Sequence, residues 1–225
     1  MSSGFFVTGV STEVGKTYVG SLIARALYRA GRRVGVYKPV ASGCREEGGV
    51  TIAADAEALW EAAGRPLTLE QVCPQRFLAP LAPSRAAAEE GTRVDDEQLV
   101  AGLAPWRAAC DVLLVEGAGG LMSPLSDAWY NVDLAARLGL PLLVVANNHL
   151  GVINATLQTL ITARARAPEL PVAGVILNDA AHRPDDLSLS SNAAEIAARA
   201  DAPLLATIAF GQQQLEPERA LSWLR

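Results

Sequence analysis

The sequence predicts an α/β fold, a single domain over residues 1–225 whose mostly parallel sheet carries helices on both faces. Short apolar runs alternate with helical patterns along the whole chain, which is the order seen in parallel α/β proteins. Half of the residues are hydrophobic and few are aromatic, a composition that suits helices packed on a buried sheet. Polar clusters also follow directly after apolar runs, where such sheets bind ligands.

The expected elements follow from the spacing of the apolar residues. Strands are predicted where short apolar runs stop at polar residues or glycine, at 5–7, 33–37, 111–115, 141–146, 172–177 and 204–209. Helices are predicted where apolar residues recur at helical spacing, at 17–30, 53–63, 84–90, 95–109, 131–139, 151–166, 189–200 and 217–224. Loops are expected at 41–49 and at 66–83, the second with one short strand.

Charge and composition exclude several classes of function. The net charge is −5, so there is no general basic surface for nucleic acid. No apolar run reaches membrane-spanning length, and no signal peptide is visible. The three cysteines, Cys44, Cys73 and Cys110, form no metal or disulfide pattern. We therefore expect a cytoplasmic protein that binds neither nucleic acid nor membranes.

The loop after the first strand predicts a phosphate-binding site. Residues 9–17 read Gly-Val-Ser-Thr-Glu-Val-Gly-Lys-Thr and open onto the first helix. Loop N–H groups and the helix N-terminus both point at an anion held there. This is the arrangement of a P-loop NTPase-like fold, in which Lys16 would reach the β- and γ-phosphates and Thr17 would ligate Mg²⁺. Five residues separate Gly9 from Gly15, one more than usual.

The use of lysine singles out a second residue. Of the 19 Lys and Arg residues, only Lys16 and Lys38 are lysines. A compact ammonium differs from the planar guanidinium fork, so we expect both lysines where a compact charge is required. Lys38 and Ser42 follow the second strand and would face the P-loop if the first two strands flank the site. The alternative is that Lys38 is an ordinary surface lysine.

Two acidic residues are candidate magnesium ligands, since Mg²⁺ prefers hard oxygen donors. Glu116 follows four apolar strand residues, which is the placement of a Walker-B acid. Asp55 begins the helix after the 41–49 loop, where an acidic residue could instead complement the helix dipole. The glycine run 117–120 could let a ligand lie against the backbone or could simply form a tight turn.

Several of these stretches together resemble the dethiobiotin synthetase family. The matching segments are 6–9 with 12–17, 37–43, 115–120 with Pro124-Leu125, 150–154, and Asn178-Asp179. The longer P-loop is that family's own form. The resemblance implies an ATP- and Mg²⁺-dependent enzyme that joins 7,8-diaminopelargonic acid and CO₂ into dethiobiotin, releasing ADP and phosphate. One amine would add CO₂ to form a carbamate. The carbamate oxygen would attack the γ-phosphoryl group to form a mixed anhydride, and the second amine would then attack the carbonyl carbon and close the ring, releasing phosphate.

The resemblance also assigns residues to roles. It implies catalytic roles for Lys38, Lys16 and Thr12, and metal ligands Thr17, Asp55 and Glu116. It implies nucleotide contacts from Glu13, Val14, Gly15, Lys16, Thr17, Tyr18 and Asn178. It implies substrate contacts from Thr12, Lys38, Ser42, Gly119, Leu150, Gly151 and Asn154. The last three come from the partner subunit in that family, so a homodimer with shared sites is expected.

Two departures from the family and three alternative functions stay open at this level. Ile208-Ala209-Phe210 replaces the usual Ile-Pro pair, which puts strict ATP preference in question, and His149 could lie at the substrate entrance or on the plain surface. A related amide ligase acting on cobyrinic acid is one alternative. A partitioning ATPase is another, although that class carries a lysine near Thr12 or Glu13 that this chain lacks. A non-enzymatic nucleotide switch is the third.

Overall fold

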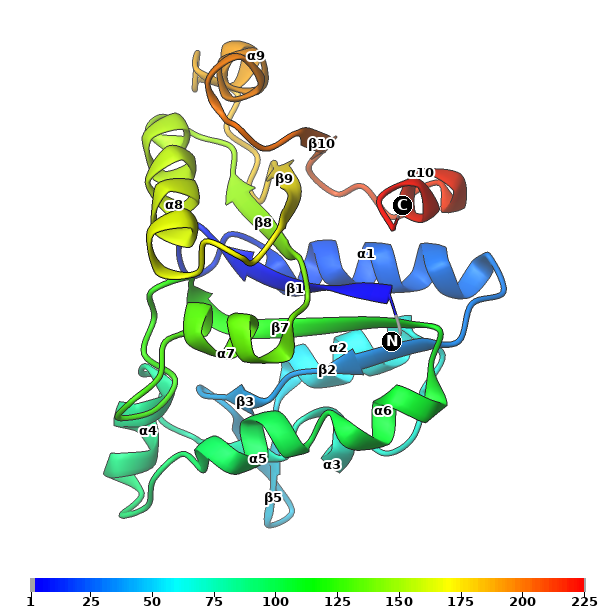
Figure 1. The fold of residues 1–225 in the computed structure, drawn as a ribbon, viewed down its shortest axis with the longest axis vertical. Helices are drawn as coiled ribbons and strands as arrows, with labels where there is room; N and C mark the ends of the chain where they lie inside the picture. The colour runs from blue at the N-terminus through cyan, green and yellow to red at the C-terminus, as the bar shows by residue number, and fades with distance from the viewer. Residues whose placement is uncertain (1–2, 225) are drawn as a thin grey trace.

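The main sheet has six strands in the order β10-β9-β8-β1-β7-β2, and every neighbouring pair is parallel. It is seen in a computed structural model that describes residues 3–224 (Figure 1). The α/β class predicted above is confirmed. The strands are β1 Ser3–Gly9, β2 Val34–Tyr37, β7 Val112–Gly120, β8 Leu142–Asn147, β9 Val172–Asn178 and β10 Leu204–Ile208.

Two small two-stranded sheets lie outside the main one. β3 (Val40–Ala41) pairs in parallel with β6 (Gln75–Arg76), which confirms the short strand expected in 66–83. β4 (Arg45–Glu47) and β5 (Val50–Ile52) form a hairpin, so the expected loop 41–49 is only partly irregular. Gly48 and Gly49, both at positive φ, make the two-residue turn that this hairpin needs.

Ten helices connect the strands within residues 3–224. They are α1 Lys16–Arg29, α2 Ala54–Ala62, α3 Leu69–Val72, α4 Pro83–Glu89, α5 Asp96–Ala101, α6 Ala104–Ala109, α7 Asn131–Leu138, α8 Val152–Arg166, α9 Leu189–Arg199 and α10 Pro217–Ser222. The single helix expected at 95–109 is wrong. It is two helices, because Pro105 has no N–H to continue a helix and instead occupies the first turn of α6. α3, which begins with a capping box of Thr68 and Gln71, was not expected.

Helices cover both faces of the sheet, as predicted. α1 packs against β1, β7 and β2, and α2 and α10 lie against α1 on the same side. α7 contacts β7, α8 contacts β8, and α9 contacts both α8 and β10. The chain crosses the sheet in one direction from β1 to β2 and in the opposite direction from β7 to β10. Because crossovers between parallel strands are right-handed, the helices of these two sets of connections lie on opposite faces. Within residues 3–224, no helix combines the length and hydrophobicity needed to span a membrane.

The order of the strands places the functional loops at one edge of the sheet. β1 lies between β8 and β7, and the helices that follow β1 and β8 lie on opposite faces, which opens a crevice beyond the strand ends. The first two strands of the chain are not neighbours in the sheet, because β7 lies between β1 and β2. Lys38, which follows β2, therefore contacts Glu116 in the middle of β7.

Candidate active site

The P-loop joins β1 to α1 with the backbone of an anion-binding loop. Gly15 is in the left-handed conformation (φ 87°) and precedes the first residue of α1, Lys16. Glu13 is also left-handed (φ 59°), a conformation uncommon outside glycine. Among the described residues, no side chain caps the N-terminus of α1. Its N–H groups are therefore left for an anion, to which the helix dipole adds attraction.

Asn178, at the end of β9, braces the P-loop from the side. It is buried, and its Nδ2 donates a hydrogen bond of 3.0 Å to the backbone oxygen of Val14. A side chain at Gly15 would clash there, because a Cβ atom would lie 2.2 Å from Nδ2. The Oδ1 atom of Asn178 is buried and has no hydrogen-bond partner among residues 3–224, which leaves it for a ligand donor.

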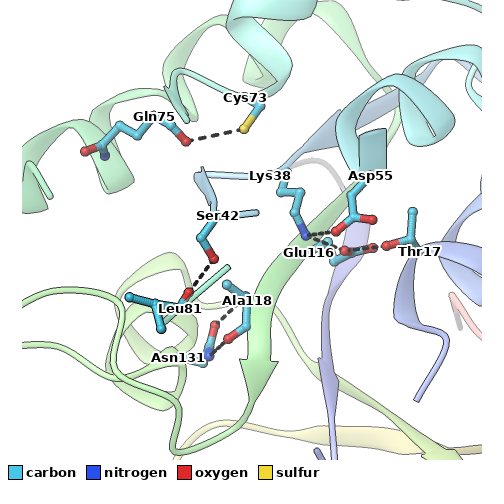
Figure 2. A network of polar contacts seen from close by, with 10 residues as sticks. All are labelled: Thr17, Lys38, Ser42, Asp55, Cys73, Gln75, Leu81, Glu116, Ala118 and Asn131. Atoms are coloured by element: carbon cyan, nitrogen blue, oxygen red, sulfur yellow. Dashed lines mark hydrogen bonds and ion pairs between the residues drawn. The ribbon is translucent and has the colours of Figure 1, made fainter. Parts of the chain in front are cut away.

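Lys38 binds both predicted acidic ligands at once (Figure 2). Its Nζ donates to Glu116 Oε1 at 2.6 Å and lies 3.0 Å from Asp55 Oδ2. Thr17 donates to the same Glu116 oxygen at 2.8 Å. The side chains of Lys38 and Glu116 are 4% and 2% exposed, whereas that of Asp55 is 53% exposed. The cluster is therefore buried on the Lys38–Glu116 side and open on the Asp55 side.

The charges of this cluster shift one another's pKa values. Burial would lower the pKa of Lys38, but the carboxylates of Glu116 and Asp55 outweigh it and raise the pKa above its usual value. Partial burial would raise the pKa of Asp55, but Lys38, Thr17 and Lys16 lower it overall. The pKa of Lys16 is lowered, mainly by burial and also by the nearby charge of Lys38. The carboxylates of Glu116 and Asp55 oppose this shift without reversing it. Lys38 and Asp55 are thus held in their charged forms.

The oxygen atoms of this cluster fit a magnesium ion. Thr17, Asp55 and Glu116 supply one hydroxyl and two carboxylates, and Glu116 Oε2 is buried with no hydrogen-bond partner in the described part of the chain. Residues 3–224 contain no group of three or more His, Cys, Asp or Glu side chains that could enclose a metal. Mg²⁺ does not require one, since it commonly takes one or two carboxylates and fills its shell with water and phosphate.

The glycine run belongs to β7 itself, which continues to Gly120 beyond the strand expected at 111–115. The pairing with β1 shifts register between Val7 and Gly9, so the run bulges there. Asn131 holds the bulge in place. Its Oδ1 accepts from the N–H of Ala118 at 3.1 Å, and its Nδ2 donates to the oxygen of Ala118 (Figure 2). The same Nδ2 also donates to the oxygen of Gly120. This positioning residue was not predicted, and its one signal in the sequence is an asparagine at the start of the expected helix 131–139.

A cavity of about 570 Å³ lies over the P-loop and joins most of the predicted site. Predicted residues among its lining are Thr12, Glu13, Gly15, Lys16, Thr17, Tyr18, Lys38, Ser42, Asp55, Gly119 and Asn178. Glu116 lies beneath it in contact with Lys38, and Val14 is buried under the loop. Ser42 lines the cavity, although its hydroxyl donates to the Leu81 oxygen at 2.6 Å in this state (Figure 2).

Four further residues beside Asn178 line the cavity without having been predicted as site residues. They are Asp179, Ala180, Phe210 and Gly211. Phe210, which departs from the family pattern, is exposed and stacks obliquely near His182, with ring centroids 6.0 Å apart. Tyr18 donates to the Gln212 oxygen and ties α1 to this loop.

Three predicted substrate residues lie away from this cavity. Leu150, Gly151 and Asn154, at the start of α8, are exposed and do not line it. His149 does not line it either, and its Nδ1 lies 2.6 Å from the Leu150 oxygen. Within one chain, Leu150, Gly151 and Asn154 therefore lie outside the cavity over the P-loop, although Ala155 of the same helix lines a second cavity together with Ser11 and Thr12.

Comparison with known proteins identifies the family. Residues 3–219 match the family model described as an AAA domain. The chain is 44% identical over 219 residues to the ATP-dependent dethiobiotin synthetase BioD of Rhodopirellula baltica, covering 92% of this chain and 84% of that protein. It is 44% identical over 194 residues to the synthetase of the same name from Anaeromyxobacter dehalogenans strain 2CP-C, covering 86% and 84%. The chain belongs to the dethiobiotin synthetase family.

Solved structures of lower identity show how widely this fold is used. A ParA family ATPase from Chlorobium tepidum (16% identical, TM-score 0.55) matches 100% of this chain and 91% of its own. A cobyrinic acid a,c-diamide synthase from Mycobacterium smegmatis (18%, 0.55) matches 100% and 92%. At these identities the likeness concerns the P-loop fold alone. The cobyrinic acid amide ligase and the partitioning ATPase, which were raised above as alternatives, thus share the fold with this chain. Sequence similarity favours the dethiobiotin synthetases.

The contact between Gly15 and Asn178 yields a test of the P-loop. We expect Gly15→Ala to weaken binding of Mg²⁺·ADP at least about tenfold, because the added methyl group collides with Asn178 and displaces the loop N–H groups. Gly31→Ala is the matched control. Gly31 has a similar φ of +76° but open space around it, so it should lose about 1 kcal/mol of unfolding free energy and keep its nucleotide affinity. Calorimetric binding with denaturant unfolding measures both, and equal nucleotide affinities of the two variants would contradict the prediction.

Proposed function

We propose that this chain catalyses the ATP-dependent carboxylation and ring closure of 7,8-diaminopelargonic acid to dethiobiotin. Family membership supports the reaction, and one observation of the structure carries it. Both lysines of the chain line a single cavity with Thr17 and Asp55, above the buried Glu116. A simple nucleotide switch needs the P-loop lysine alone. A second ammonium beside the γ-phosphate position suits a reaction in which a carbamate, itself an anion, attacks that phosphate.

The residues of the site would act mainly through charge and position. Lys16, at the start of α1, would neutralise the β- and γ-phosphates together with the N–H groups of the loop. Lys38 would hold the carbamate oxygen in line with the γ-phosphorus and stabilise the charge that develops on transfer. Mg²⁺ held by Thr17, Asp55 and Glu116 would neutralise the phosphate oxygens further. Thr12, near Gly119 at the crown of the loop, would donate to the substrate.

The far end of the cavity would bind the nucleoside. Asn178 has an unpartnered buried Oδ1 that can accept from an adenine amino group while Nδ2 stays on Val14. Tyr18 and Phe210 would flank the nucleoside, and Glu13 would lie near the diamine. We propose a cytoplasmic location, consistent with the lack of any disulfide in residues 3–224.

We also propose that two copies of the chain share their sites. Leu150 is 79% exposed, and α8 begins beside it with N–H groups that no side chain caps within the described residues. Such a helix N-terminus suits the carboxylate of the diamine, but it lies outside its own chain's cavity. A partner subunit that brings its Leu150, Gly151 and Asn154 to the cavity would complete the site.

Phosphate release tests the reaction itself. We expect the protein to release phosphate from ATP only when both 7,8-diaminopelargonic acid and bicarbonate are present, with one dethiobiotin formed per phosphate. The physical reason is that the attacking oxygen belongs to the carbamate, which forms only from both compounds. Coupled phosphate detection with mass spectrometry of the product measures this. Phosphate release that ignores both compounds would refute the carboxylase function.

Lys38→Arg tests whether a compact ammonium is required. The variant keeps the charge and the ion pairs, so we expect an unchanged melting temperature within a few degrees. We expect turnover to fall by about 100-fold or more, because the wider guanidinium fork cannot occupy the same point beside the transferring phosphoryl group. Arg29→Lys, an exposed exchange at the end of α1, is the control and should leave turnover unchanged. Turnover of Lys38→Arg close to that of the wild type would contradict the role given to Lys38.

Mixed dimers test the shared site. Lys38→Ala and Asn154→Ala should each be nearly inactive alone, because every site of a homodimer then lacks one group. A mixture that exchanges subunits forms some sites with Lys38 from one chain and Asn154 from the other, and should recover up to about one quarter of the wild-type activity. If the mixture shows no more activity than the average of the two variants, each site is built from one chain.

A further inference from the structure

Lys38 occupies the oxygen atoms that the proposed metal would need. Its Nζ lies 2.6 Å from Glu116 Oε1 and 3.0 Å from Asp55 Oδ2, so one ammonium contacts both carboxylates of the cluster. The oxygen of Glu116 that receives Lys38 also receives the hydroxyl of Thr17 at 2.8 Å. All three proposed metal ligands are therefore joined into one network around a cation that belongs to the protein.

This arrangement answers a problem of buried charge. Glu116 is 2% exposed, and a buried carboxylate without a counter-charge is strongly destabilising. In a protein that must also exist without nucleotide, some cation has to stand beside Glu116. Lys38 satisfies that need in the structure, while Lys16 at the P-loop supplies the second positive charge nearby.

We propose that Lys38 is an exchangeable counter-ion: it holds the carboxylates of Asp55 and Glu116 in the nucleotide-free protein, and the metal that arrives with the nucleotide displaces its ammonium into the cavity. The inference rests on the proposed metal ligands and goes beyond them. It makes the metal and the ammonium competitors for the same oxygens. Lys38 then becomes free to bind an anionic carbamate only after the nucleotide is loaded.

The geometry gives the displaced ammonium a route. Lys38 lines the same cavity as Lys16 and Thr12, and the Asp55 side of the cluster is open, with half of the Asp55 side chain exposed. A divalent cation restores the charge that Lys38 withdraws from the carboxylates. The bound phosphates attract the released ammonium towards the position where phosphoryl transfer takes place.

Metal binding without nucleotide tests this exchange. Mn²⁺, followed by its electron paramagnetic resonance signal, is the probe. Removing the ammonium in Lys38→Met leaves two carboxylates with no counter-charge, so we expect nucleotide-free Mn²⁺ affinity to rise about tenfold or more over the wild type. Arg33→Met is the matched control. It removes a cation from the exposed Arg33–Asp111 pair, which has the same 2.6 Å separation, and should leave Mn²⁺ affinity unchanged. Unchanged Mn²⁺ affinity in a folded Lys38→Met protein overturns the proposal.

A second measurement follows the wild-type protein and so does not depend on how Lys38→Met folds. With only two lysines in the chain, selective ¹⁵N labelling of lysine yields two side-chain signals, assigned through the Lys38→Arg variant. We expect Lys38 to show a protected ammonium signal without ligand. Mg²⁺ with a non-hydrolysable ATP analogue should shift that signal and speed its hydrogen exchange, and the analogue without metal should do so much less. A Lys38 signal that stays unchanged while the Lys16 signal shifts overturns the exchange.

Failure of the exchange and failure of the proposed metal site give different results. Asp55→Asn and Glu116→Gln should both weaken Mn²⁺ binding in the presence of the ATP analogue if the ligand assignment is right. If neither variant weakens Mn²⁺ binding, the metal site is elsewhere and the proposed ligand roles of Asp55 and Glu116 are wrong. If both do so and Lys38→Met has no effect on Mn²⁺ affinity, the metal site stands and only the exchange is wrong.

Discussion

The pairing of Lys38 with Glu116 and Asp55 is the constraint around which this site is built. Burial of a carboxylate and an ammonium side by side is favourable only if each keeps its partner at close range. Three separate segments must then meet: the residue after β2, the middle of β7 and the start of α2. The parallel sheet makes this possible, because β2 and β7 are neighbours and Tyr37 pairs with Val115, which sets Lys38 beside Glu116.

Two buried asparagines hold the backbone of the site in place through hydrogen bonds. Asn178 holds the carbonyl of Val14 in the P-loop, and Asn131 holds both backbone groups of Ala118 in the bulge of β7. Loops that expose N–H groups to a ligand cannot satisfy all their own hydrogen bonds, so a side-chain amide supplies the missing partners. The backbone groups of these two loops are therefore fixed before a ligand arrives, which favours electrostatic catalysis.

The fold neighbours show that the scaffold alone does not decide the chemistry. The ParA family ATPase and the cobyrinic acid a,c-diamide synthase share the P-loop fold with this chain at low sequence identity. What separates the dethiobiotin synthetases from such fold neighbours must lie in the side chains over the P-loop. In this chain the second lysine and the Glu116 glycine run are the features that a nucleotide switch does not need.

The sequence by itself determined the α/β class, the P-loop and most of the residues around the cavity. It could do so because the period of apolar residues and the glycine–lysine–threonine spacing are local signals. It left open what distant segments decide. The place of β7 between β1 and β2 depends on sheet pairing, and the role of Asn131 depends on a bulge thirteen residues away. The division of 95–109 has a local cause, Pro105, which the prediction of one helix overlooked. The direct contact of Lys38 with both acids was likewise decided only by the tertiary structure, since no spacing in the chain records which oxygens an ammonium will reach.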